Sequence, residues 1–197
     1  MRKLRCVIFS MLLIGLFLIY WLWPDNETLP ILDSVNAFQL EEVHGENYKS
    51  DNGKVKVITF FFTQCPDICP LTMIDFRDLQ TQLKDNGLFG DQVELVAVSL
   101  DPENDLPETI KNYADTFQAD PYGWKWLRGT PEETKQIAKE LQMQYEIEDG
   151  VVMYHSITMY LVDSNNNIRA LYDMATSNNP VNKDEILEDI NVLVQGN

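Results

Sequence analysis

The chain has 197 residues, of which 45% are hydrophobic and three are cysteines. This length is that of one ordinary domain with an additional segment, and so few cysteines exclude a disulfide-dense scaffold, which leaves the core to apolar side chains. Asp and Glu number 31 against 15 Lys and Arg, a formal net charge of −16. Such a surface disfavours nucleic acid and anionic lipid as partners, and it suits cationic or metal-bearing partners or simply solubility.

The N-terminus has the pattern of a membrane anchor. A basic start, MRKLR, is followed by an uncharged run of 18 residues from Cys6 to Trp23, which as a helix spans roughly 27 Å, close to the thickness of a bilayer core. Because basic flanks stay on the cytoplasmic side, we expect a single-pass protein of a bacterial cell membrane with its domain outside the cytoplasm. A cleaved signal peptide is the alternative, although no A-x-A-like site follows Trp23.

The first elements after the anchor are predicted to be strands. The run FQLEEV, Phe38 to Val43, and the polar turn HGEN before Tyr48 indicate a strand or hairpin. Residues Val55 to Phe62 form a nearly continuous apolar run rich in β-branched and aromatic side chains, typical of a strand buried on both faces. This strand leads directly into the stretch TQCPDICP, which contains two cysteines.

A helix and a second buried strand should follow. Apolar residues recur at roughly helical spacing from Leu71 to Leu83, with Gly87 as a stop signal. Pro70 suits the first turn, where its missing N–H costs nothing, so the helix should begin at or just before Cys69. The run VELVAVSL, Val93 to Leu100, predicts a parallel partner for the first buried strand, and together the three elements make a βαβ unit.

The rest of the chain completes an α/β domain. Trp124 and Trp126 fall in a loop-like stretch, and we expect their side chains in the core. The other predicted elements are a polar loop at 101–105, helices over 107–117, 131–144 and 182–194, and an antiparallel hairpin of 157–163 with 168–173 around an Asn-rich turn. This order predicts a thioredoxin-like mixed sheet flanked by helices, with the two thiols between the first central strand and its helix.

Cys65 and Cys69 are the first candidates for chemistry. At i and i+4 near a helix start, both sulfurs face one way and can reach one ligand or each other. A helix N-terminus lowers the pKa of a thiol and favours the thiolate. A purely structural disulfide would close a loop of only three residues and stabilise little. Dithiol redox chemistry and metal binding therefore both remain open.

His155 favours the metal. The chain has two histidines, and we expect His44 to be solvated in its turn. His155 precedes the strand at 157–163, in the loop that a thioredoxin-like domain packs against its cysteines and where thiol oxidoreductases of this fold usually carry a cis-proline; no proline lies between Pro131 and Pro180. Two thiolates and one imidazole suit copper, as Cu(I) or Cu(II). Zinc would accept the same set, but structural zinc normally takes four protein ligands and no fourth is evident.

Three patterns, in order, carry a resemblance to a known family. They are T-x-C-P-D-x-C-P over Thr63 to Pro70, S-x-D-P-x-x-D over Ser99 to Asp105, and H-x-x-x-x-Y-L over His155 to Leu161. From about Phe38 to its end the sequence resembles the Sco family, also called SCO1/SenC, the copper-handling proteins of cytochrome c oxidase assembly. It departs from the family pattern at Tyr154, where members often carry Asp.

The resemblance implies a thioredoxin-like fold in which Cys65, Cys69 and His155 bind copper. It also implies a chaperone that supplies the binuclear copper site of cytochrome c oxidase subunit II, or another copper acceptor. The alternatives are a thiol-disulfide oxidoreductase, with Cys65 and Cys69 as the catalytic pair that reduces the acceptor's cysteines, and a redox sensor. We therefore expect a basic flank and anchor over residues 1–24, a linker over 25–37 and a thioredoxin-like copper-binding domain over 38–197, with nothing to indicate more than a monomer.

Several neighbours of these motifs receive structural roles. Asp67 should cap the helix, and Asp101 and Asp105 should order their loop. Met153 and Met159 flank His155 and could offer thioethers to Cu(I), but strand alternation places them equally well in the core, where we expect them.

Overall fold

The computed structural model describes residues 11–15, 17, 28–45, 47–148 and 150–196. Most of the predicted flank and anchor, residues 1–24, and the first part of the linker lie outside the described residues. Among those that are described, no helix combines the length and the apolar character needed to cross a membrane.

The domain is built on one mixed sheet of eight strands in the order β1-β10-β9-β4-β5-β6-β2-β3. Their bounds are β1 Asp33–Ser34, β2 Gln39–Glu42, β3 Tyr48–Lys49, β4 Val55–Phe61, β5 Val93–Ser99, β6 Trp124–Arg128, β9 Thr158–Val162 and β10 Asn167–Asp173. The strands β4, β5 and β6 run parallel, whereas β9 is antiparallel to β4 and β10 to β9. This arrangement confirms the predicted thioredoxin-like mixed sheet, including the βαβ unit and both hairpins.

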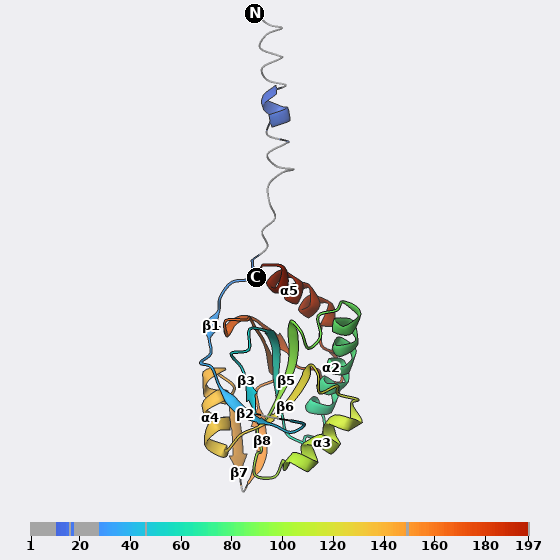
Figure 1. Cartoon of the computed structure of the whole chain (residues 1–197). Helices are drawn as coiled ribbons and strands as arrows, with labels where there is room; N and C mark the ends of the chain where they lie inside the picture. The colour runs from blue at the N-terminus through green and yellow to red at the C-terminus, as the bar shows by residue number, and fades with distance from the viewer. Residues whose placement is uncertain (1–10, 16, 18–27, 46, 149, 197) are drawn as a thin grey trace, which may run out of the picture.

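Helices cover both faces of this sheet (Figure 1). They are α2 Ile68–Asp85, α3 Pro107–Thr116, α4 Pro131–Glu140 and α5 Lys183–Gln195. Because α2 and α3 both connect neighbouring parallel strands, and such crossovers are right-handed, they lie on the same face. Helix α5 packs against α2 on that face, and α4 lies on the other side. Helix α4 ends at Glu140, four residues before the end of the predicted helix over 131–144.

The core surrounds the two central strands, since every residue of β4 and β5 is buried. Trp124 and Trp126 are also fully buried and stack on each other with ring centroids 5.3 Å apart. Their predicted place in the core is confirmed, but the predicted loop is wrong. They belong to β6, because WKW alternates with the period of a strand and pairs with β5 in parallel.

Candidate metal centre

The two cysteines lie where β4 passes into α2. Cys69 is in the first turn of α2 and is buried, whereas Cys65, in the preceding turn, is only partly buried. The Sγ of Cys65 accepts a hydrogen bond from the backbone N–H of Cys69 at 3.4 Å. A sulfur thus satisfies one of the free amides at the helix start, a task usually done by an N-cap side chain. The prediction that Asp67 caps the helix is wrong: it occupies the N-cap position, but its exposed side chain makes no capping hydrogen bond.

The third residue comes from an element that the sequence reasoning missed. His155 ends β8 (Val151–His155), which pairs with β7 (Tyr145–Glu148) in a two-stranded antiparallel sheet separate from the main one. Strand β7 is only four residues long and its side chains are exposed or half-buried, so it lacks the long apolar run that marks the core strands. The sequence does contain Asp149-Gly150 between them, a dipeptide that favours hairpin turns and could have indicated the hairpin.

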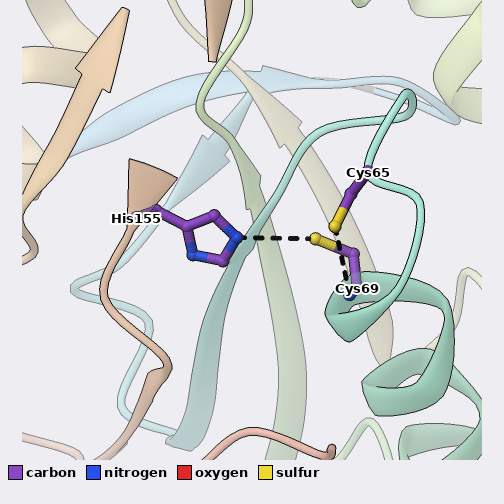
Figure 2. Close-up of side chains that lie close together, drawn as sticks. All are labelled: Cys65, Cys69 and His155. Carbon is purple, nitrogen blue, oxygen red and sulfur yellow. Dashed lines mark hydrogen bonds between the residues drawn. The ribbon is translucent and has the colours of Figure 1, made fainter. Parts of the chain in front are cut away.

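The imidazole of His155 is held in one orientation. Its Nδ1 lies 2.9 Å from the carbonyl oxygen of Ser156, so Nδ1 carries the proton and donates it. The Nε2 lone pair then points at the thiol of Cys69, with 3.8 Å between Nε2 and Sγ (Figure 2). The ring is 8% exposed and meets Phe62 edge to face. Such a hydrogen bond on the far nitrogen is the usual arrangement for a metal-binding histidine.

Cys65, Cys69 and His155 offer three ligand atoms within 4.8 Å of one another. Sulfur and nitrogen bound to one ion at roughly 2.3 and 2.1 Å would stand about 3.8 Å apart at a trigonal angle. The observed separation of 3.8 Å between Cys69 and His155 already has that value. In the described part of the chain, no fourth His, Cys, Asp or Glu joins this group, so the donor set suits a soft ion of low coordination number.

The two thiols share one proton. A hydrogen bond from Cys69 lowers the pKa of Cys65 to about 4, with help from backbone amides, although burial opposes the shift. The same hydrogen bond and burial raise the pKa of Cys69 above its ordinary value. At neutral pH the metal-free pair is therefore a Cys65 thiolate beside a protonated Cys69.

The neighbouring acids order their loop as predicted. Asp101 accepts hydrogen bonds from the Asn104 side chain at 2.9 Å. The carboxylate of Asp105 accepts from the hydroxyl of Ser99 at 2.6 Å and also from Thr63, two residues before Cys65. Burial raises the pKa of Asp105. Sequence reasoning missed its reach to the cysteine turn, because that contact joins residues 42 positions apart.

The two methionines that flank His155 and the second histidine lie in different surroundings. Met159 is fully buried, so its place in the core is confirmed. Met153 is 62% exposed, and its predicted core position is wrong because β8 belongs to a small hairpin outside the main sheet. His44 is not simply solvated: it is partly buried, and its Nδ1 lies 3.1 Å from the buried carboxylate of Glu42.

The family model SCO1/SenC matches residues 28–194 of the chain. Among curated proteins, "SCO1 protein homolog" of Bacillus subtilis (strain 168) is 29% identical over 168 residues, which are 82% of this chain and 83% of that protein. "Protein SCO1 homolog 1, mitochondrial" of Arabidopsis thaliana is 34% identical over 124 residues, 61% of this chain. The chain spans only 36% of that longer protein.

Solved structures give the same picture. A SCO1/SenC family lipoprotein from Bacillus anthracis str. Ames is 29% identical with a TM-score of 0.73, over 83% of this chain and 96% of that one. Arabidopsis thaliana ScoI with copper bound is 31% identical with a TM-score of 0.65, over 80% and 98%. BsSco, in which a disulfide switch was identified, is 25% identical with a TM-score of 0.72, over 85% and 98%.

Proposed function

The chain belongs to the SCO1/SenC family, and from this premise we propose that it is a copper chaperone whose cargo is bound by Cys65, Cys69 and His155. The observation that carries the proposal is the convergence of two sulfurs and one imidazole nitrogen within 4.8 Å. Thiolate and imidazole together favour copper, and Cu(I) is satisfied with two or three such ligands. The copper-bound structure of the similar Arabidopsis protein supports the same choice of metal.

The protonation of the site suits capture of the ion. The Cys65 thiolate is ready to bind, and Nε2 of His155 is free because Nδ1 donates to Ser156. Only Cys69 has to lose a proton, and it does so when copper takes the place of that proton.

Release follows from the unequal burial of the ligands. Cys65 is the most accessible of the three, whereas Cys69 and His155 are buried. An incoming ligand of an acceptor protein therefore displaces Cys65 first, while the other two still hold the ion. Transfer proceeds by ligand exchange and never exposes free copper to solvent.

We place the chaperone at the outer face of a bacterial cell membrane. Residues 1–24 would form the basic flank and the single anchor, residues 25–37 the linker and residues 38–197 the copper-binding domain. The acceptor would be the binuclear copper site of cytochrome c oxidase subunit II. BsSco is described as a member of the Sco family of cytochrome c oxidase assembly proteins, which supports this acceptor class.

A second function, thiol-disulfide exchange, is favoured by the Cys65 thiolate beside the Cys69 thiol. Cys65 would attack a disulfide of the acceptor and form a mixed disulfide. Cys69 would then lose its proton to the departing acceptor thiolate and attack the Cys65 sulfur, which forms the Cys65–Cys69 disulfide and releases the second acceptor sulfur as a thiolate that takes its proton from water. This chemistry does not require His155 as a ligand, whereas copper transfer does.

The test is a copper titration of the reduced full-length protein in detergent, with Cu(I) against a competing chelator and Cu(II) by thiolate charge-transfer absorption. We expect one ion per chain, no tight binding after Cys65→Ser or Cys69→Ser, and weaker binding with an altered spectrum after His155→Ala. Unchanged affinity in all three variants would overturn the copper site. Failure of the wild type to compete, together with ready cycling of the disulfide, would transfer the assignment to thiol exchange.

A further inference from the structure

The loop between β5 and α3, residues 99–105, contacts both halves of the metal centre. Asp105 reaches the cysteine turn, and Asn104 reaches the hairpin that carries His155. The hairpin β7–β8, the start of α3 and the start of α2 lie at the same end of the domain (Figure 1). This loop is the S-x-D-P-x-x-D pattern of the sequence, to which the proposed function gives no task.

Asp105 holds the turn before Cys65 through hydrogen bonds. Its fully buried carboxylate accepts from the backbone N–H of Thr63 at 3.1 Å, from the hydroxyl of Thr63 and from the hydroxyl of Ser99 at 2.6 Å. Ser99 is the last residue of β5. Hydrogen bonds to a buried charged acceptor are among the stronger ones. The turn that leads to Cys65 is therefore tied to the end of a rigid central strand.

Asn104 holds the hairpin that carries His155 through a hydrogen bond. Its Nδ2 donates to the carbonyl oxygen of Gly150, in the turn of the β7–β8 hairpin, at 2.9 Å. The same nitrogen lies 2.9 Å from both carboxylate oxygens of Asp101, which holds the amide in place. Strands β7 and β8 form a sheet separate from the main one. The hydrogen bond from Asn104 to Gly150 connects this hairpin to the loop that contains Asp105.

We propose that Asn104 and Asp105 are positioning residues that set the distance between the cysteine pair and His155. The copper-affinity test of this proposal rests on the proposed function, whereas its test by NMR of the metal-free protein does not. The 3.8 Å separation of Sγ and Nε2 joins two segments that are 86 residues apart in sequence. Ligands held at the right spacing before the ion arrives lose less freedom on binding, so loosening either tie weakens copper binding without removing a ligand.

The metal-free test uses the histidine ring signals in NMR spectra of full-length protein labelled at histidine, since His44 and His155 are the two histidines. Asn104→Ala should shift or broaden the His155 signals and leave those of His44 unchanged. Asn104 is exposed, so its replacement should leave the fold intact. The matched control is Asn86→Ala, which also removes an Asn side chain that donates to a backbone carbonyl, that of Gln82 at 2.8 Å.

The copper test measures affinity. Asn104→Ala should weaken copper binding about tenfold, as is common for groups that orient a ligand from outside, and Asn86→Ala should not. In a His155→Ala background the loss from Asn104→Ala should disappear, because the residue acts through His155. A loss of the same size in both backgrounds, or no loss and unmoved His155 signals, would overturn the role of Asn104.

Asp105 is tested separately through the cysteine side. Asp105→Asn and the nearly isosteric Thr63→Val should each weaken copper binding and shift the Cu(II)–thiolate absorption, and both effects should persist with His155→Ala. The control Asp75→Asn alters another buried carboxylate, which accepts from the Val181 amide at 2.8 Å. Equal spectra in all these variants would overturn the role of Asp105. If the wild type binds no copper while the His155 signals still respond to Asn104→Ala, the proposed function fails and the positioning role stands.

Discussion

Copper binding should release one proton between pH 7 and 8, because the metal-free thiol pair holds one. The pKa of Cys65 is lowered to about 4, so it carries none there. The pKa of Cys69 is raised above its ordinary value, so its proton stays until the ion displaces it. Copper affinity should therefore rise tenfold per pH unit, or about 1.4 kcal/mol.

Two measurements check this proton count. The first is competition with a chelator of known protonation at pH 7.0, 7.5 and 8.0; the second is titration calorimetry in buffers that differ in ionisation enthalpy. Two independent thiols with ordinary pKa values near 8.5 would release nearly two protons at pH 7, and affinity would rise about sixtyfold from pH 7 to pH 8. A slope near two, or near zero, would refute the shared proton. Repeating both on His155→Ala removes the imidazole from the count.

Three other predictions concern the thiols and the core. At pH 6 iodoacetamide should modify Cys65 and spare Cys69, as read by peptide mass spectrometry; preferential modification of Cys69 would contradict the assigned thiolate. Burial lowers the pKa of Lys56 from 10.5 to about 8, so the charged lysine costs the native state about 3 kcal/mol at pH 7, and wild-type stability should rise between pH 8 and 10.5. Lys56→Met should add up to about 3 kcal/mol to the free energy of unfolding in urea at pH 7 and flatten that rise; an unchanged pH profile would count against it. Phe61→Ala, which empties a site packed against Trp126, should cost about 3–5 kcal/mol in the same assay, and a loss below 1 kcal/mol would contradict the packing.

Segments with a strong local signal were predictable. The run from Val55 to Phe61 is almost entirely apolar, with Lys56 and Thr59 as the polar exceptions, and it forms the fully buried β4. Helix α2 carries its own apolar spacing and ends just before Gly87, whose φ of 68° suits glycine. The convergence of Cys65, Cys69 and His155 could be anticipated because the fold places those loops together.

What could not be predicted depends on partners distant in the sequence. β6 is only five residues long, and the pairing that defines it is with β5. The backbone N–H of Cys69 donates to the sulfur of Cys65 and not to the side chain of Asp67, and no capping rule anticipates a sulfur in that role. Met153 alternates like a core residue, but its hairpin has no layer over that side chain. In each case the local pattern was compatible with the prediction, and the tertiary neighbours decided otherwise.

Because His155 lies on a hairpin far from the cysteines in sequence, a bound copper ion should also stabilise the folded protein. An ion held by Cys69 and His155 joins points 86 residues apart, and a covalent crosslink of that span removes roughly 4–5 kcal/mol of chain entropy from the unfolded state. Bound copper would thus act as a crosslink that stabilises the folded chain. The copper-bound chain should therefore resist heat and proteolysis better than the metal-free chain, and the protein should become less stable once it has delivered its ion.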